Sequence, residues 1–260
     1  NFMDFQKSNP ASAFYEDPRN RACIMQLLSL SDAMQTTMPE LERRFSSFNP
    51  RCAVFMNQMN NIGNPARDPA KGLTVGWGGS AGHYEDIKAV APALIELLEK
   101  RPDITLAIMA DDIITSLFDA VPAERKRIVQ PGSLEKYYEF VQTLDIGIAP
   151  IREEEFNLCR SDVKFMEYAS RGVVPVCSNV PTYARTLRDG GTGFLFDTPE
   201  EMIRIIGELA DDAELRARVG LAAFEYIRDE RSEKACAEER FRFYNSLIEE
   251  FSLEISGGLD

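Results

Sequence analysis

Several residue types are scarce in this 260-residue chain, and each scarcity excludes a class of protein. There is one histidine, and the five cysteines include no C-x-x-C pair, so no pattern typical of a zinc site is present and we expect no bound metal. The odd number and wide spacing of the cysteines indicate a reduced, cytoplasmic protein. No apolar run approaches about 18 residues, so no transmembrane helix is predicted.

Positive charge is also scarce. The 29 Lys and Arg residues face 42 Asp and Glu residues, which gives a formal net charge of −13. Nucleic acids and anionic membrane surfaces need a basic footprint, so neither is expected as the main partner. A local cluster of Arg and Lys could still bind a small anionic ligand. Since the chain begins at Asn1 without a recognisable signal peptide, we expect an excised fragment or a processed chain.

The order of predicted elements from Gly72 onward indicates the α/β class. Strands are predicted at 73–77, 104–109, 127–130, 146–150, 173–177 and 193–196. Helices are predicted at 84–100, 113–118, 134–144, 162–171, 182–187, 199–210, 212–228 and 232–252. Strands that alternate with helices predict a doubly wound parallel sheet with helices on both faces.

The first 65 residues hold only about one α/β unit. Residues 1–20 are predicted to be irregular, 21–31 helical and 33–37 a short strand. A helix over 39–46 would be capped by Thr36 or Thr37, with Pro39 in its first turn, and 52–56 is predicted as a buried strand. Residues 57–69 are rich in Asn, Gly and Pro and are predicted as a linker.

The stretch from Arg160 to Pro175, RSDVKFMEYASRGVVP, is the part around which the other motifs are organised. Ser161 and Asp162 are of the types that cap helix N-termini, and the apolar residues behind them recur at helical spacing. We therefore expect a helix with one buried face. Gly172 should end this helix, because glycine is the usual residue at a helix C-terminus.

Charged side chains surround the start of this predicted helix. Arg160 and Lys164 would lie beside unpaired backbone N–H groups and the positive end of the helix dipole, so an anion site is expected there. Glu167, three residues after Lys164, would repel a phosphate but suits the two hydroxyls of a ribose. The alternative interpretation is an ordinary amphipathic helix with an exposed Lys164–Glu167 pair.

A glycine-rich turn, GWGGSAGH over 76–83, follows the first predicted strand of the sheet. Such a turn lets a phosphate approach the backbone closely, although the spacing is not the dinucleotide pattern G-x-G-x-x-G. The alternative is a plain tight turn, and a lone histidine such as His83 is more often a packed or capping residue. Asp111 and Asp112 are predicted to cap a helix, and the segment 189–193 to form a structural turn.

Both motifs resemble those of the family 4 (group 1) glycosyltransferases of GT-B fold. One branch has the donor-site pattern F-N-x-x-K-S-D-x-K-x-x-E-Y-A-x-x-G-x-x-P-V. It is matched by Phe156, Asn157, Arg160, Ser161, Asp162, Lys164, Glu167, Tyr168, Ala169, Gly172, Pro175 and Val176. The branch's loop G-G-S-x-x-H-x-x-D is matched by Gly78, Gly79, Ser80, His83 and Asp86. Two departures stand out: Arg160 replaces a lysine, and Cys159 stands where most of the family has a first glutamate.

The resemblance implies a Rossmann-like, doubly wound half of a GT-B fold. Residues 1–65 would be the end of the N-terminal acceptor domain, 66–231 the donor-binding domain, and 232–260 a helix that packs back toward the N-terminal domain. The implied activity is metal-independent transfer of a hexose-type sugar from a nucleotide-diphosphate sugar to an acceptor, in glycan biosynthesis. No cofactor is implied, since the nucleotide sugar is a substrate.

The resemblance also assigns parts of the donor to residues, with none named as catalytic. Glu167 would bind the ribose, and Gly132 and Ser133 the nucleobase. The diphosphate would contact Gly78, Gly79, Ser80, His83, Arg160, Ser161 and Lys164.

Two other functions remain open at this stage. Cys159 motivates a non-catalytic nucleotide-sugar binding module, and a sugar-nucleotide epimerase of the same fold is disfavoured because only the transferase motif matches. Because GT-B chemistry takes place between two domains, we expect the isolated chain to be inactive. Apolar residues of the last helix would be left partly uncovered, which predicts a homodimer. These residues are Phe241, Phe243, Tyr244, Leu247 and Ile248.

Overall fold

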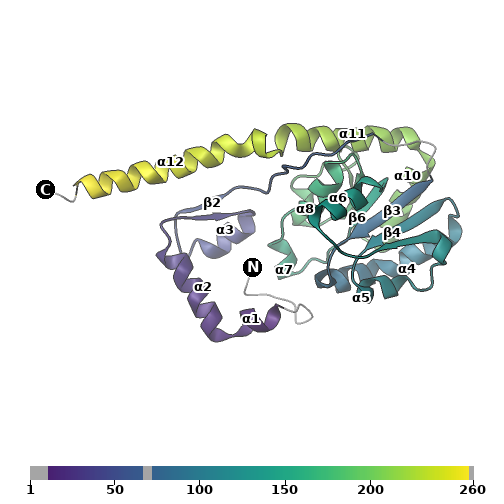
Figure 1. Ribbon diagram of the computed structural model, residues 1–260, viewed down its shortest axis with the longest axis horizontal. Coiled ribbons are helices and arrows are strands. Elements are labelled where there is room, and N and C mark those ends of the chain that lie inside the picture. Colours follow the sequence, from purple (N-terminus) through teal and green to yellow (C-terminus); the bar gives the residue numbers. More distant parts are fainter. Residues whose placement is uncertain (1–10, 67–71, 258–260) are drawn as a thin grey trace.

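The computed structural model describes residues 11–66 and 72–257. Figure 1 shows a large α/β domain (72–230) and a smaller N-terminal lobe (11–56), with the long helix α12 (Glu233–Gly257) extending from the domain along the lobe. The N-terminal ten residues, for which an irregular structure was predicted, lie outside the described residues. Within the described ranges, no helix is both long and apolar enough to cross a bilayer.

The α/β domain is built on one six-stranded sheet in which every pair of neighbouring strands is parallel. The strand order is β5-β4-β3-β6-β7-β8. The strands are β3 (Leu73–Gly78), β4 (Ile104–Met109), β5 (Lys126–Val129), β6 (Ile146–Ala149), β7 (Val174–Ser178) and β8 (Phe194–Phe196). From β3 the successive strands are added toward one edge of the sheet as far as β5, and from β6 they are added toward the other edge. In such sheets ligands bind beside this switch point between β3 and β6, at the carboxyl ends of the strands.

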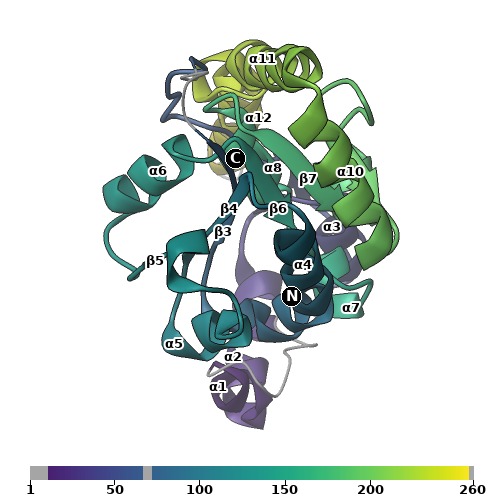
Figure 2. The same cartoon turned by 90° about the vertical axis from the view of Figure 1, so that its right-hand side faces the viewer.

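Helices cover both faces of the sheet, which confirms the predicted doubly wound class. Figure 2 shows α6 on one side of the sheet and α4 and α10 on the other. The helices of the domain are α4 (Tyr84–Lys100), α5 (Asp112–Thr115), α6 (Leu134–Gln142), α7 (Glu155–Leu158), α8 (Val163–Ala169), α9 (Pro181–Ala184), α10 (Pro199–Asp211) and α11 (Ala213–Glu230). Three single 3-10 turns are η1 (Ala81–His83), η2 (Ser116–Phe118) and η3 (Ala123–Arg125).

Two apolar clusters form the core, one on each face of the sheet. The first joins α4 and α10 to the sheet and contains Trp77, the single tryptophan, which is 1% exposed. The second joins α6, α8 and α11 to the other face. Because the strands are buried on both faces, they form nearly continuous apolar runs in the sequence, and this explains why the periodicity located all six of them.

The N-terminal lobe differs from the prediction at three points. Residues 11–20, expected to be irregular, contain α1 (Ser12–Glu16) and the start of α2 (Pro18–Leu30), because the Asp17 side chain accepts a hydrogen bond from the Arg19 backbone and Pro18 suits the first helical position. The predicted Thr36 or Thr37 cap of α3 (Pro39–Phe45) is wrong, since Met38 holds that position without a side-chain bond. Strand β2 (Cys52–Val54) is half-buried and not buried.

The lobe's sheet consists of two parallel strands, β1 (Met34–Thr36) and β2. Helix α12 packs against it: the Phe243 ring lies 5.4 Å from that of Phe55, and the Tyr244 hydroxyl donates a 2.6 Å hydrogen bond to Gln35. On the outer side of α12, Phe241 and Ile248 are exposed.

Two segments of chain run between the lobe and the domain, and they meet at one place. The linker 57–66 passes the junction of α11 and α12, where the Met59 N–H donates to the Arg231 carbonyl at 2.8 Å. The Glu233 N–H donates in turn to the Met59 carbonyl at 3.2 Å. The two crossings are therefore hydrogen-bonded to each other.

Candidate functional site

Two pockets lie at the carboxyl ends of the central strands. The first, which we call the β4–β5 pocket, has a volume of about 380 Å³. It is lined by Gly79, Ser80, Met109, Asp111, Pro131, Gly132, Ser133, Leu134 and Tyr137. Four predicted site residues, the glycine and serine of the glycine-rich turn and those of the turn after β5, thus meet in one cavity.

The second pocket, which we call the α8 pocket, has a volume of about 390 Å³. It is lined by Thr37, His83, Ile151, Cys159, Arg160, Ser161, Val163, Lys164 and Tyr183. Four further predicted residues gather here, namely His83, Arg160, Ser161 and Lys164. One wall comes from Thr37 of the N-terminal lobe, so the pocket is shared between the two parts of the chain.

A hydrogen-bonded cluster of three side chains links the two pockets, since it contains Tyr137, which lines the β4–β5 pocket, and Lys164, which lines the α8 pocket. The Tyr137 hydroxyl donates to Glu167 Oε2 at 2.7 Å, and Lys164 Nζ donates to the same oxygen at 3.0 Å and to the Tyr137 hydroxyl at 2.7 Å. The side chains of Lys164 and Glu167 are only 17% and 11% exposed. The alternative interpretation of a solvated surface pair is therefore wrong, because α8 is buried on most of its circumference.

The second carboxylate oxygen of Glu167, Oε1, is still available. It accepts no hydrogen bond from any described residue, and it is not among the buried unpaired atoms of the described chain. Glu167 lines neither pocket itself, but it is hydrogen-bonded to Tyr137 of one and Lys164 of the other, so Oε1 is an acceptor beside both pockets that has no described partner. Carboxylate oxygens accept the strongest hydrogen bonds that a hydroxyl can donate.

Arg160 is a partly buried cation that forms no ion pair with a described carboxylate, although Asp86 lies near enough to favour its charged form. Its Nη1 lies 3.0 and 2.9 Å from the two ring nitrogens of His83, and its guanidinium carbon stands 4.8 Å from the centre of the Phe156 ring. Burial lowers the pKa of Arg160, as expected for a cation withdrawn from water. A partly buried cation without a direct ion-pair partner is stabilised when an anion binds beside it.

His83 is held by a buried carboxylate on α4. Its Nδ1 lies 3.1 Å from Asp86 Oδ2, and since a carboxylate only accepts, this nitrogen carries the proton. Asp86 is 2% exposed, and its other oxygen accepts the Arg152 backbone N–H at 3.1 Å. Burial lowers the pKa of His83 despite the opposing effect of Asp86, so the ring is neutral near pH 7 and Nε2 faces Arg160 with its lone pair.

The start of α8 does not have the predicted caps. Ser161 Oγ accepts a 2.6 Å hydrogen bond from Asn57 of the linker and bonds no helix N–H. Asp162 occupies the N-cap position, but its carboxylate binds Arg231 through two bonds of 2.8 and 3.0 Å. A buried guanidinium needs a counter-charge more than a helix terminus needs a cap, so the ion pair takes this carboxylate.

Gly78 and Gly79 of the glycine-rich turn are needed because a side chain would not fit, and not because the backbone adopts unusual dihedral angles. No glycine in it has a positive φ. A Cβ at Gly78 would lie 2.8 Å from the Tyr137 ring, and one at Gly79 would collide with Trp77. Gly78 itself lines neither pocket, so its part is to let the Tyr137 ring approach strand β3.

Other predicted capping and turn positions gave mixed outcomes. Ser133 caps α6 by accepting the Lys136 N–H at 3.3 Å, which the sequence did not single out. Asp111 stands at the N-cap of α5 without making a side-chain bond. In the 189–193 turn, Asp189 accepts the Leu195 N–H at 2.9 Å, and φ is 68° at Gly190, which confirms a structural turn.

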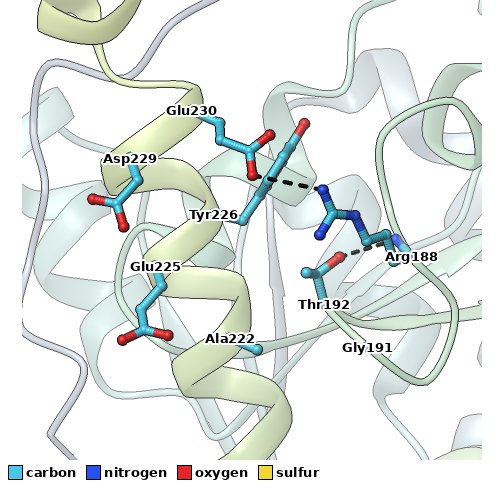
Figure 3. Close-up of a pocket in the computed structure, with 8 residues that line it drawn as sticks. All are labelled: Arg188, Gly191, Thr192, Ala222, Glu225, Tyr226, Asp229 and Glu230. Atoms are coloured by element: carbon cyan, nitrogen blue, oxygen red, sulfur yellow. Dashed lines mark hydrogen bonds and ion pairs between the residues drawn. The ribbon is translucent and has the colours of Figure 1, made fainter.

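A third pocket of about 320 Å³ lies between this turn and α11 (Figure 3). Arg188 crosses it to pair with Glu230 at 3.5 Å, and its backbone N–H donates to the Thr192 hydroxyl at 2.9 Å. None of the predicted site residues lines it. Across residues 11–66 and 72–257, no three His, Cys, Asp or Glu side chains are grouped as a metal site would require.

Comparisons with known proteins agree on one family. The family model described as "Glycosyl transferases group 1" matches residues 72–212. No curated protein sequence matches the chain. Among solved structures, TarM from S. aureus superposes with a TM-score of 0.70 at 14% identity, covering 87% of this chain and 46% of TarM, so the chain spans about half of that protein.

Two further structures are similar over more of their own length. HepE from Anabaena has a TM-score of 0.71 at 13% identity, covering 92% of this chain and 70% of HepE. Sucrose-phosphate synthase from Thermosynechococcus elongatus has a TM-score of 0.69 at 15% identity, covering 94% of this chain and 65% of the synthase. At these identities the likeness establishes a shared fold.

Proposed function

The chain belongs to the group 1 glycosyl transferases, and from this premise we propose that its α/β domain binds a nucleotide-diphosphate sugar whose sugar the whole protein transfers to an acceptor. The six-stranded parallel sheet with its flanking helices is the Rossmann-like half of a GT-B fold. The observation that carries the proposal is Arg160. It is a partly buried cation that forms no ion pair with a described carboxylate, in a pocket whose Lys164 is hydrogen-bonded to Tyr137 of a second, more apolar pocket.

The two pockets suggest how the donor lies. The nucleobase would enter the β4–β5 pocket, against the backbone of Gly132 and Ser133. The ribose would bridge the pockets and donate a hydrogen bond to the available Oε1 of Glu167. The diphosphate and sugar would then occupy the α8 pocket beside Arg160 and Lys164.

The charges in the α8 pocket suit the departure of a nucleoside diphosphate. Negative charge grows on the leaving diphosphate as the sugar bond breaks, and fixed cations aimed at it lower the barrier without reorganising. Lys164 shares its charge with Glu167, so Arg160 would contribute the larger part. Neutral His83 orients Arg160 through Nε2 and adds no competing negative charge. No resident cofactor is required, because the nucleotide sugar is the substrate.

The similar structures guide the choice of nucleotide. HepE was solved with UDP-glucose, and TarM in a complex that includes UDP. This supports a nucleotide-diphosphate sugar as the ligand class and makes UDP the first nucleotide to test.

The absence of a C-x-x-C pair and the odd number of cysteines favour a reducing, cytoplasmic location.

A second candidate is a donor-binding protein without turnover. Cys159 is 5% exposed and lines the α8 pocket at the position where the family pattern has its first glutamate. A thiol there cannot give the charge or the hydrogen bonds of a carboxylate. Hydrolysis of a nucleotide sugar by the full-length protein would favour the transferase, and tight donor binding without hydrolysis or transfer would favour this candidate.

Calorimetric titration of the chain with UDP, GDP, ADP, CMP and TDP tests the proposal. At least one should bind, and Arg160→Ala should weaken that nucleotide by about 10- to 100-fold, the worth of one charge-assisted hydrogen bond. The matched control is Arg204→Ala on α10, where an exposed arginine already pairs with Glu201 and Glu208. Binding of none of the five nucleotides, or equal losses in both variants, would refute the proposal.

A further inference from the structure

Tyr137 both lines the β4–β5 pocket and is hydrogen-bonded to the charged pair Lys164 and Glu167 on α8. It lies on α6, and its hydroxyl accepts from Lys164 Nζ while donating to Glu167 Oε2. The Lys164 ammonium also stands 4.6 Å from the centre of the Tyr137 ring, where a cation is attracted to the π face. No role was predicted for this residue, because an aromatic side chain on an amphipathic helix usually belongs to the core.

The Tyr137 hydroxyl determines which hydrogen-bonding atoms of Lys164 and Glu167 remain available to a ligand. Two donors, the hydroxyl and the ammonium, converge on the single oxygen Oε2, and this leaves Oε1 without a described partner. Without the hydroxyl, the carboxylate is free to rotate and offer both oxygens to Lys164. The two opposite charges would then satisfy each other, and fewer acceptors and donors would point toward the pockets.

Tyr137 is itself rigidly held. Its ring packs on the backbone of Gly78, where a Cβ would come within 2.8 Å of it. Its backbone N–H donates to the Ser133 carbonyl at 3.0 Å in the first turn of α6, next to residues that also line the β4–β5 pocket. Burial and the neighbouring Glu167 raise the pKa of Tyr137 well above its usual range, which keeps the hydroxyl protonated as a donor.

We propose that Tyr137 is a positioning residue that holds Glu167 with one oxygen open for the ribose and holds Lys164 toward the diphosphate. This inference rests on the proposed function and deepens it. It assigns the discrimination between ribose and deoxyribose to a pair of residues, Tyr137 and Glu167, on two different helices. Tyr137 acts through its neighbours and need not touch the ligand.

The test compares Tyr137→Phe with Tyr138→Phe in the 260-residue chain. The control is closely matched, because the two rings are adjacent at 5.9 Å and the one hydrogen bond that the Tyr138 hydroxyl makes to a described residue goes to the Met59 sulfur, at 3.7 Å. UDP and 2′-deoxy-UDP are titrated into each protein by calorimetry. We expect Tyr137→Phe to weaken UDP about tenfold and 2′-deoxy-UDP much less, so that the preference for ribose falls toward one. Tyr138→Phe should leave both affinities within about twofold.

A double-mutant cycle separates positioning from a general loss of structure. In a Glu167→Gln background, Tyr137→Phe should cost little further affinity, since the carboxylate that it positions is already gone. Equal weakening of UDP and 2′-deoxy-UDP by Tyr137→Phe, or full additivity with Glu167→Gln, would overturn the inference while leaving the proposed function intact. If wild type binds no nucleoside diphosphate, both fall.

Discussion

Replacing Arg231 with methionine is expected to lower the free energy of unfolding of the α/β domain by about 3–5 kcal/mol. Arg231 and Asp162 have side chains that are 4% and 3% exposed, and they are joined by two hydrogen bonds. Without the guanidinium, the Asp162 carboxylate stays buried with one remaining side-chain donor, the Thr186 hydroxyl at 2.7 Å. The cost is that of a buried charge left without its counter-ion.

The converse change should be as harmful, and the double change less so. Asp162→Asn keeps the shape but leaves a buried cation whose Nε already has no hydrogen-bond partner. In the double variant Asp162→Asn, Arg231→Met neither charge remains, so we expect a loss clearly smaller than the sum of the two single losses. A positive coupling of this kind identifies the pair itself as the source of the effect.

Urea denaturation followed by tryptophan fluorescence measures these losses directly. Trp77 is the single tryptophan and is buried in the core of the α/β domain, so its emission reports the unfolding of that domain. The control is Glu238→Gln on α12, which breaks an ion pair with Arg242 whose side chains are 75% and 73% exposed and should cost less than about 1 kcal/mol. A cost for Arg231→Met no larger than for this control would refute the reasoning.

Four further predictions follow from the site and the surface. Lys164→Ala should weaken the binding of UDP far more than the binding of uridine, and this difference should shrink at high salt. Glu167→Gln should weaken the binding of both by similar factors, as measured by calorimetry. Burial depresses the pKa of His83 below its value in the unfolded chain. The stability that neutral His83 contributes is therefore present above about pH 6.5 and is lost as the pH falls through the folded pKa. His83→Gln should flatten this part of a stability–pH profile. The chain alone should not transfer sugar from any nucleotide sugar, because the lobe supplies only a two-stranded sheet opposite the cleft; turnover without an added partner would contradict this. The exposed Phe241 and Ile248 on α12 should drive dimerisation at high concentration, measured by ultracentrifugation, and Phe241→Ser should weaken it.

Local sequence patterns located all six strands of the α/β domain and most of its helices, but not the short helix α7. Each of its strands is a short apolar run, as ITLAIM in β4, because helices cover both faces of the sheet. The motifs also brought Arg160, Lys164 and His83 to one pocket, since a parallel sheet places the ends of its strands at one edge. These features depend on neighbours in the chain or on a fixed topology.

The interactions that organise the site join residues that are distant in the sequence, and no local sequence pattern predicts them. Tyr137 is separated from Glu167 by 30 positions, and Arg231 from Asp162 by 69. Their partners are chosen by packing, so Asp162 could be predicted as a cap but not as half of a buried ion pair. The missed start of α2 is different, because Asp17 followed by Pro18 is a recognisable signal for a helix beginning.

The junction at Met59 has a mechanical consequence. The chain crosses between lobe and domain twice, and the two crossings are hydrogen-bonded side by side at Met59, Arg231 and Glu233. The two crossings are thus tied to each other at one point, and the Arg44–Glu155 ion pair between α3 and α7 ties the lobe to the domain at a second. Arg231 also forms an ion pair with Asp162, the residue that precedes α8. The junction is therefore anchored at the start of the helix that carries Lys164 and Glu167. A displacement of the lobe that moved the Thr37 wall would therefore have to deform a junction that is anchored at the helix carrying Lys164 and Glu167.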